Sequence, residues 1–221
     1  MLPRTPQLKP DRGALAGPLS GVSFVASLTA LNALSDASYP VPGADAAVIR
    51  RFFSQEHRAA RIGAGAQLVC AGSLAWFSRS VVRLASRARR GSRALRAGSI
   101  AGGALAATSL AASALLTVAL TTDLAKRKAT AESLYRLMFA TGGPIHGVGL
   151  GLLVGSLGLA GSRTGEMPRG LSTTALASAA AGALSPLALV GKAGLVFIPL
   201  GRLSALLVSG IAGVRLARAK G

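Results

Sequence analysis

The stretch that decides the fold is residues 137–162, LMFATGGPIHGVGLGLLVGSLGLAGS, which runs for 26 residues without Asp, Glu, Lys or Arg. A helix needs about 20 apolar residues to cross the hydrocarbon of a bilayer, so this stretch is long enough to span one. Gly143, Gly147, Gly151 and Gly155 recur every four residues along one face of the predicted helix. Since membrane helices associate through close contact of small residues, the spacing predicts a central packing helix.

The chain has five further apolar stretches, three before this one and two after it. Four of the five also lack charged residues. The six stretches leave a remainder that holds 31 of the 32 charged residues in a chain of 221. Such a remainder cannot build a soluble core. The sequence therefore predicts an all-α polytopic membrane protein, a bundle of six transmembrane helices with short loops in one integral membrane domain (1–221). The predicted spans are 14–34, 61–80, 98–121, 138–160, 171–190 and 195–215.

The formal net charge of +18 is explained by insertion into a membrane. With both termini inside, the inner segments hold 15 Lys and Arg and the outer segments hold 10, so the positive-inside rule places both termini in the cytoplasm. Residues 79–96 carry seven Arg between the second and third spans, as expected of a cytoplasmic loop. We expect these residues to attract anionic lipid headgroups at that face, and we do not expect nucleic-acid binding.

The first span follows a short basic segment and has to be distinguished from a signal peptide. Ala33, Leu34 and Ser35 resemble a cleavage site. The apolar run is 21 residues long, however, whereas signal peptides have about 7 to 15. We therefore interpret residues 14–34 as a retained span.

An amphipathic segment is predicted between the first two spans. Asp45 is a suitable cap for a short helix. Its apolar face is predicted to carry Val48, Ile49, Phe52 and Phe53, with Arg50, Arg51, Gln55 and Arg58 on the opposite face. We expect this helix to lie along the outer surface. It is either a lid over an outward-facing cavity or an interfacial helix that seats the loop. Tyr39 and Tyr135, near the outer ends of two spans, are predicted interfacial anchors.

Three polar side chains interrupt the apolar stretches: Gln67, His146 and Arg202. Each lies about six to nine residues inside the outer end of its span, so the three could meet at one depth. One hypothesis is a small polar site open to the outside, in which His146 changes charge and Arg202 holds an anion. The alternative is that Arg202 extends to the interface, His146 bonds a neighbouring backbone and Gln67 pairs across helices.

Enzyme motifs are missing from the sequence. It has no metal-binding spacing, no phosphate-binding loop and no paired carboxylates within the apolar stretches. We therefore expect no catalytic residue, cofactor or metal, and the leading hypothesis is a non-enzymatic multi-pass protein that associates with a membrane-protein partner or a second copy of itself. The alternative is a small-molecule transporter or ligand sensor with an outward-facing polar site. Prolines at 144, 186 and 199 favour this alternative, since broken helices often line transporter sites.

Several segments together resemble a family of six-span membrane proteins of unknown function that are abundant in high-GC actinobacteria. The similar segments are AVIRRFFSQEHRAARIGAGAQL, AWFSRSVVRL, ESLYRLMFATGG and RTGEMPRGL. The resemblance covers nearly the whole chain as a pattern, although Gly170 and Leu171 stand where those relatives carry a Trp. It implies a bacterial inner (plasma) membrane location and no catalytic residue.

Overall fold

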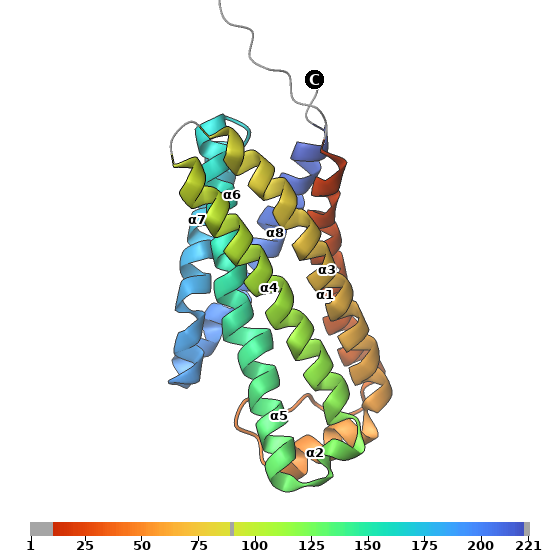
Figure 1. Cartoon of the computed structure of the whole chain (residues 1–221). Coiled ribbons are helices and arrows are strands. Elements are labelled where there is room, and N and C mark those ends of the chain that lie inside the picture. The colour runs from red at the N-terminus through yellow and green to blue at the C-terminus, as the bar shows by residue number, and fades with distance from the viewer. Residues whose placement is uncertain (1–10, 89–90, 219–221) are drawn as a thin grey trace, which may run out of the picture.

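The computed structural model describes residues 11–88 and 91–218, and these ranges form helices without strands. Six helical stretches in the described residues are long and apolar enough to cross a membrane. They alternate in direction along the bundle (Figure 1), which confirms the predicted all-α fold of a multi-pass membrane protein. The helices are α1 (Ala16–Leu34), α3 (His57–Arg87), α4 (Ser92–Leu120), α5 (Lys128–Ala140), α6 (His146–Thr164), α7 (Arg169–Leu184) and α8 (Phe197–Arg218).

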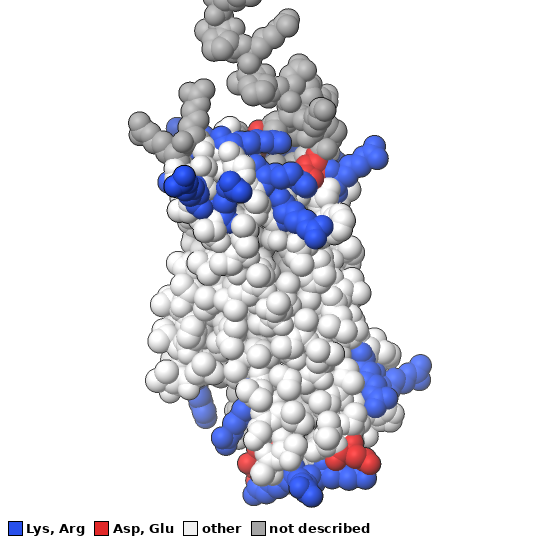
Figure 2. Space-filling view, viewed as in Figure 1, with Lys and Arg blue, Asp and Glu red and all other residues white. Residues whose placement is uncertain are grey.

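Two ends of the bundle are distinguished by their short elements. At the α2 end, α2 (Ala46–Gln55) lies across the bundle beside the lower end of α5 in Figure 1. Residues of α2 also share a hollow with η2 (Asp123–Lys126). At the α3–α4 end lie the turn from α3 into α4 and η1 (Arg12–Leu15). Figure 2 shows Lys and Arg gathered at both ends of the visible face, with a broad uncharged band between them. This distribution is what a bilayer requires of a spanning protein.

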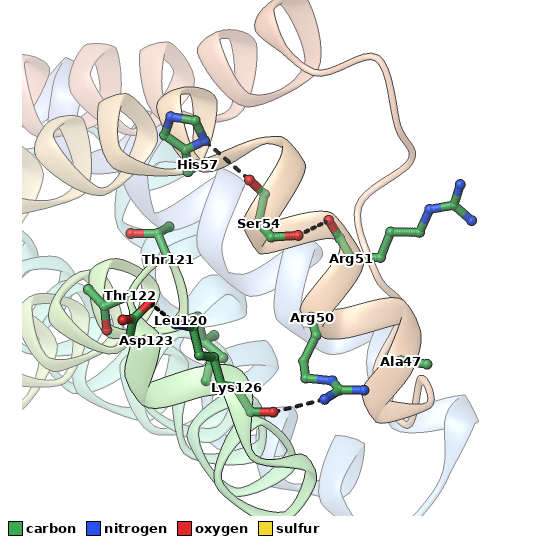
Figure 3. Close-up of a pocket in the computed structure, with 11 residues that line it drawn as sticks. Ala47, Arg50, Arg51, Ser54, His57, Leu120, Thr121, Thr122, Asp123 and Lys126 are labelled. Carbon is green, nitrogen blue, oxygen red and sulfur yellow. Dashed lines mark hydrogen bonds and ion pairs between the residues drawn. The ribbon is translucent and has the colours of Figure 1, made fainter.

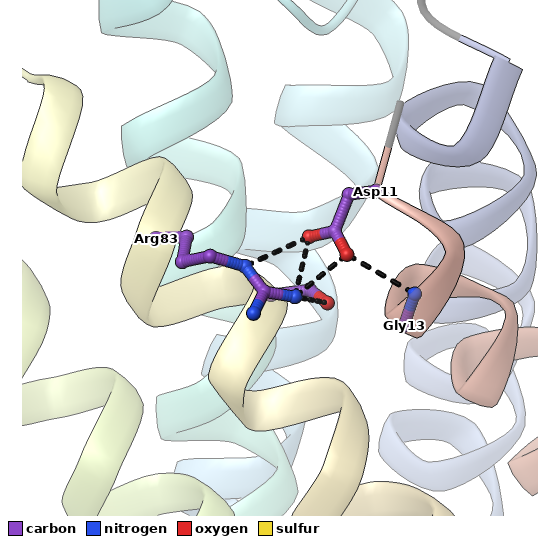
Figure 4. A network of polar contacts seen from close by, with 4 residues as sticks. Asp11, Gly13 and Arg83 are labelled. Atoms are coloured by element: carbon purple, nitrogen blue, oxygen red, sulfur yellow. Dashed lines mark hydrogen bonds and ion pairs between the residues drawn. The ribbon is translucent and has the colours of Figure 1, made fainter. Parts of the chain in front are cut away.

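Much of the arginine-rich segment is helical, because α3 continues to Arg87 and α4 begins at Ser92. Arg83 faces Asp11, whose carboxylate oxygens accept hydrogen bonds from Arg83 Nη2 at 2.6 and 2.8 Å (Figure 4). Asp11 also caps η1 by accepting a hydrogen bond from the Gly13 amide. The Asp11 amide in turn bonds to the Leu216 carbonyl. These contacts hold the first described residues against α3 and α8.

The helix α6 lies against neighbouring backbones on two sides. On the α4 side, a Cβ at Gly149 would lie 2.9 Å from Ala106 Cα, and a Cβ at Gly102 would lie 2.9 Å from the Gly149 carbonyl oxygen. On the α7 side, a Cβ at Gly151 would lie 3.0 Å from the Ala179 carbonyl oxygen. Such spacings leave no room for a side chain. Glycine at these positions therefore sets the distance between helices.

The row of four glycines predicted to pack helices faces α7, α8 and their connection. A Cβ at Gly147 would meet Ser185 Oγ at 2.5 Å, one at Gly155 would meet Ala179 Cβ at 3.0 Å, and one at Gly143 would meet Ile198 Cδ1 at 3.3 Å. Gly149 belongs to a different face, which is as closely packed against α4. The four-residue spacing of glycines in the sequence thus predicted the face of α6 toward α7 and α8, but not the face toward α4.

An aromatic cluster closes the α2 end of the bundle. Asp45 caps α2, its side chain accepting a hydrogen bond from the Ala47 amide at 2.8 Å. Phe52 and Phe53 are then buried against α5, and Tyr39 meets both of them edge to face. Tyr135 is 3% exposed within this cluster and donates a hydrogen bond to the Pro40 carbonyl at 2.5 Å. Tyr135 is therefore a core residue and not the interfacial anchor predicted from the sequence, because α2 covers it.

The glycine contacts predict position-dependent effects of adding one methyl group. Gly149→Ala should lower the free energy of unfolding by about 1 to 3 kcal/mol, and the midpoint of thermal unfolding with it, because the new Cβ meets the backbone of α4. Gly65→Ala is the matched control, because a Cβ there meets nothing within 4 Å. Both variants would be measured in the same detergent. Equal midpoints for the two variants would contradict the packing described above.

Candidate functional site

The site lies where α8 begins beside the interior of the α5–α6 helix. From Lys128 to Thr164 the chain forms 37 helical residues, about 55 Å at 1.5 Å per residue. The 16 residues of α7 span only about 24 Å. Because α7 is short, its connection to α8 ends well before the α2 end, as Figure 1 shows. The first turns of α8 therefore lie beside the junction of α5 with α6.

Proline accounts for the local structure of these helices. Pro144 lies in η3 (Thr141–Ile145), a π-helical turn in which the His146 amide bonds to the Thr141 carbonyl. Pro144 has no N–H to donate, and a π turn shifts the carbonyls around it out of α-helical register. Pro186 lies in η4 (Ser185–Leu189), directly after α7 ends. Pro199 lies in the first turn of α8, where proline is tolerated, and does not interrupt the helix.

Arg202 points from α8 toward this π turn. Its Nη2 donates hydrogen bonds to the carbonyls of Gly142 and Gly143. The guanidinium carbon also lies 5.0 Å from the centroid of the Phe24 ring on α1, a cation–π distance. Its Nε is buried without a hydrogen-bond partner. Arg202 is thus directed into the bundle and does not extend to the interface.

A cavity of about 340 Å³ adjoins Arg202. Its wall contains side chains that are exposed on the outside of the bundle, including Leu28 and Tyr39, which are 43% and 37% exposed. The cavity is therefore open to its surroundings. Its other lining residues come from α1, the 39–42 segment, α3, α4, α5, η3 and α8; the polar ones are Ser27, Asn32, Gln67, Ser113, Thr117, Tyr135 and Arg202.

The structure brings two of the three predicted polar residues together. Gln67 of α3 and Arg202 both line the cavity, and Gln67 Oε1 is buried without a hydrogen-bond partner. His146 does not line it. The His146 ring is completely buried, and its Nδ1 lies 2.9 Å from the Ala106 carbonyl oxygen of α4. His146 therefore bonds to a neighbouring backbone, which is the alternative considered for it.

Two other hollows lie on the surface, and in neither do several polar side chains point toward one place where a ligand would bind. One, between α2 and η2, is lined by Arg50, Arg51, His57, Asp123 and Lys126 among others. In Figure 3, Arg50 reaches the Lys126 carbonyl, at 2.8 Å, while Arg51 points away from that contact. The Lys126–Asp123 ion pair there is largely exposed and contributes little. The second, an apolar groove between α1 and α8, is lined mainly by Pro18, Val25, Leu203, Leu207 and Ile211.

Sequence reasoning missed the partners of Arg202, although one signal was available. Phe24 is one of several apolar residues in its span, and nothing in the sequence placed it beside Arg202. The π turn is different, because Pro144 follows two glycines at 142 and 143. A proline after two glycines marks a place where backbone carbonyls lose their regular partners and can accept bonds from a side chain.

Comparison with protein-family models, with curated proteins and with solved structures finds no match to this chain. In the part of the chain that the structure describes, no group of three or more His, Cys, Asp or Glu side chains could hold a metal ion. The arrangement of Arg202, Gln67 and the cavity is suited to binding and orienting a polar group in an apolar setting.

Arg202 is predicted to add no stability to the protein. An arginine within a span is unfavourable by about 2.5 to 3.5 kcal/mol, and its two carbonyl bonds offset only part of this. Arg202→Met should therefore leave the midpoint of thermal unfolding of the ligand-free protein unchanged or raise it. Leu153→Ala, at a fully buried position, should lower the free energy of unfolding by about 2 to 5 kcal/mol, and the midpoint with it, and serves as the control. A comparable loss in Arg202→Met would show a structural role.

Proposed function

We propose that the protein lies in a bacterial inner membrane with both termini in the cytoplasm, so that the α2 end faces outward. Three observations support this orientation. The positive-inside count favours it. The described residues begin and end at the α3–α4 end, where Asp11 and Leu216 are joined. Arg79 and Arg87 are exposed on α3 at this same end, as expected of the side that faces anionic lipid headgroups in the cytoplasmic leaflet.

Within that orientation, the protein acts as a ligand-binding membrane protein, a sensor or carrier that takes up a small molecule from the outer side. The observation that carries this proposal is the cavity between α1, α3, α5 and α8, whose wall contains both a charged guanidinium and an amide oxygen without a hydrogen-bond partner. Ionisable groups inside a membrane protein mark functional sites, because they are expensive to place there. Pockets that bind small molecules are mostly apolar with a few convergent polar groups.

The function that the sequence favours, association with other membrane components, stays a prediction. The glycine faces of α6 are occupied by α4 and α7 of the same chain, so they are not available to a partner. For this reason the geometry supports the binding cavity better.

The orientation predicts the side on which two introduced thiols react. In a Cys70→Ala background, which removes the one native cysteine, Ser54→Cys on α2 should react with a membrane-impermeant thiol reagent in intact cells. Ser86→Cys on α3 should react only after the membrane is opened. Both serines are exposed, so accessibility to solvent is matched. Labelling of Ser86→Cys in intact cells would place the arginine-rich end outside.

The cavity predicts that a small reagent reaches its interior from the α2 end. In the same background, Gln67→Cys should react with a small impermeant methanethiosulfonate reagent in intact cells, whether the reagent is anionic or cationic. Ser99→Cys is the negative control, because Ser99 is completely buried between helices. If Gln67→Cys reacts no faster than Ser99→Cys, no ligand can enter from that side and the proposed function is wrong.

A further inference from the structure

The positive charge of Arg202 is not neutralised within the described residues. Ion pairs found there, such as Arg83 with Asp11 and Lys126 with Asp123, lie at the ends of the bundle. The partners of Arg202 are two backbone carbonyls and the Phe24 ring, all of which are formally neutral. A guanidinium remains protonated in proteins, so it cannot relieve this imbalance by losing a proton. The cavity therefore adjoins one uncompensated positive charge.

The guanidinium also has donors to spare. It carries five N–H groups in a planar fork, whereas its hydrogen bonds to described residues use only Nη2. Nε is buried without a partner. A carboxylate or phosphate presents two oxygens with the spacing of such a fork and forms two parallel hydrogen bonds with it. The free donors of Arg202 fit an oxyanion.

Four other polar groups in the cavity wall are occupied, which leaves Arg202, Gln67 and the exposed Asn32 to recognise a ligand. Ser27 Oγ donates to the Gly63 carbonyl, Ser113 Oγ to the Met138 carbonyl and Thr117 Oγ1 to the Ser113 carbonyl. Tyr135 is bonded to the Pro40 carbonyl. Gln67 Oε1 accepts no hydrogen bond. The same side-chain amide carries an NH₂ group that can donate to a ligand in the cavity that Gln67 shares with Arg202.

The remaining wall is apolar and limits the size of the ligand. Leu28, Leu31, Phe139 and Ile198 line it. The volume of about 340 Å³ lies at the lower end of small-molecule pockets, which run from about 300 to 1,000 Å³. A single short chain fits this space, whereas a two-chain lipid does not.

We propose that the cavity binds a small anionic amphiphile, with its carboxylate or similar oxyanion on Arg202 and Gln67 and its short apolar chain along Leu31 and Ile198. This inference rests on the proposed function and adds the chemical class of the ligand. The ligand enters from the aqueous outer side, as in the proposed function, and the chemistry that is recognised is an oxyanion attached to a short hydrocarbon.

The test is binding of radiolabelled octanoate to the full-length protein in nanodiscs of neutral phosphatidylcholine, with the signal of protein-free nanodiscs subtracted. We expect octanoate to compete at least tenfold better than 1-octanol, octylamine or acetate, which change the head group or remove the chain. Arg202→Met should weaken octanoate binding at least tenfold. Arg202→Lys, which keeps the charge without the planar fork, should weaken it less. Arg215→Met, at the opposite end of α8, is the matched control and should not change it.

Several results would overturn the inference. Competition by 1-octanol or octylamine equal to that of octanoate would show that the anion is not recognised. Acetate competing as well as octanoate would show that the chain is not bound. If octanoate does not bind at all while Gln67→Cys is labelled from outside, the ligand class is wrong but the cavity is still accessible. If Gln67→Cys is not labelled either, the proposed function fails as well.

Discussion

The structure depends on the close approach of α6 to α4 and α7. Within a bilayer, apolar side chains gain nothing by leaving lipid for protein, so helices are held together by van der Waals contact and by the bonds that proximity permits. The glycines at 149 and 102 let the backbones of α4 and α6 come together, and those at 151 and 182 do the same for α6 and α7. These three closely packed helices, α4, α6 and α7, form the layer against which α1, α3 and α8 are arranged.

The helix formed by α5 and α6 is interrupted at one place. Between α5 and α6 the π turn at Thr141–Ile145 breaks the α-helical pattern, and irregular backbone is tolerated in a membrane only where it is buried in protein or lines a cavity. Here it does both. Its carbonyls face Arg202, and the same turn forms part of the cavity wall. Because α7 is short, α8 begins at this level. Arg202 can therefore donate hydrogen bonds to carbonyls of the irregular turn, which satisfies some of the polar groups on both sides.

How far the sequence could predict this molecule differs between its parts. The spans follow from runs of uncharged residues, and α2 follows from Asp45 and its apolar face, because these are local patterns. The ends of α3 and α4 do not follow from hydrophobicity, since both helices continue through arginines that lie beyond the apolar stretch. Tyr135 was expected at the lipid interface, and it is buried because α2, from another part of the chain, folds over it. The sequence predicted which polar residues lie within the spans, where they are energetically unfavourable, but not which of them share a cavity.

What the sequence by itself determined is therefore the number, polarity and approximate position of the membrane-spanning helices, because each depends on the composition of a continuous segment. Only the tertiary structure decided that Gln67 and Arg202 share a cavity while His146, two residues after Pro144, turns to Ala106. The physical reason is that helix rotation and relative depth are set by contacts between segments. A glycine that admits a neighbouring backbone sets the distance between two helices, and the point where a helix ends sets which residues of the next helix lie at the same depth.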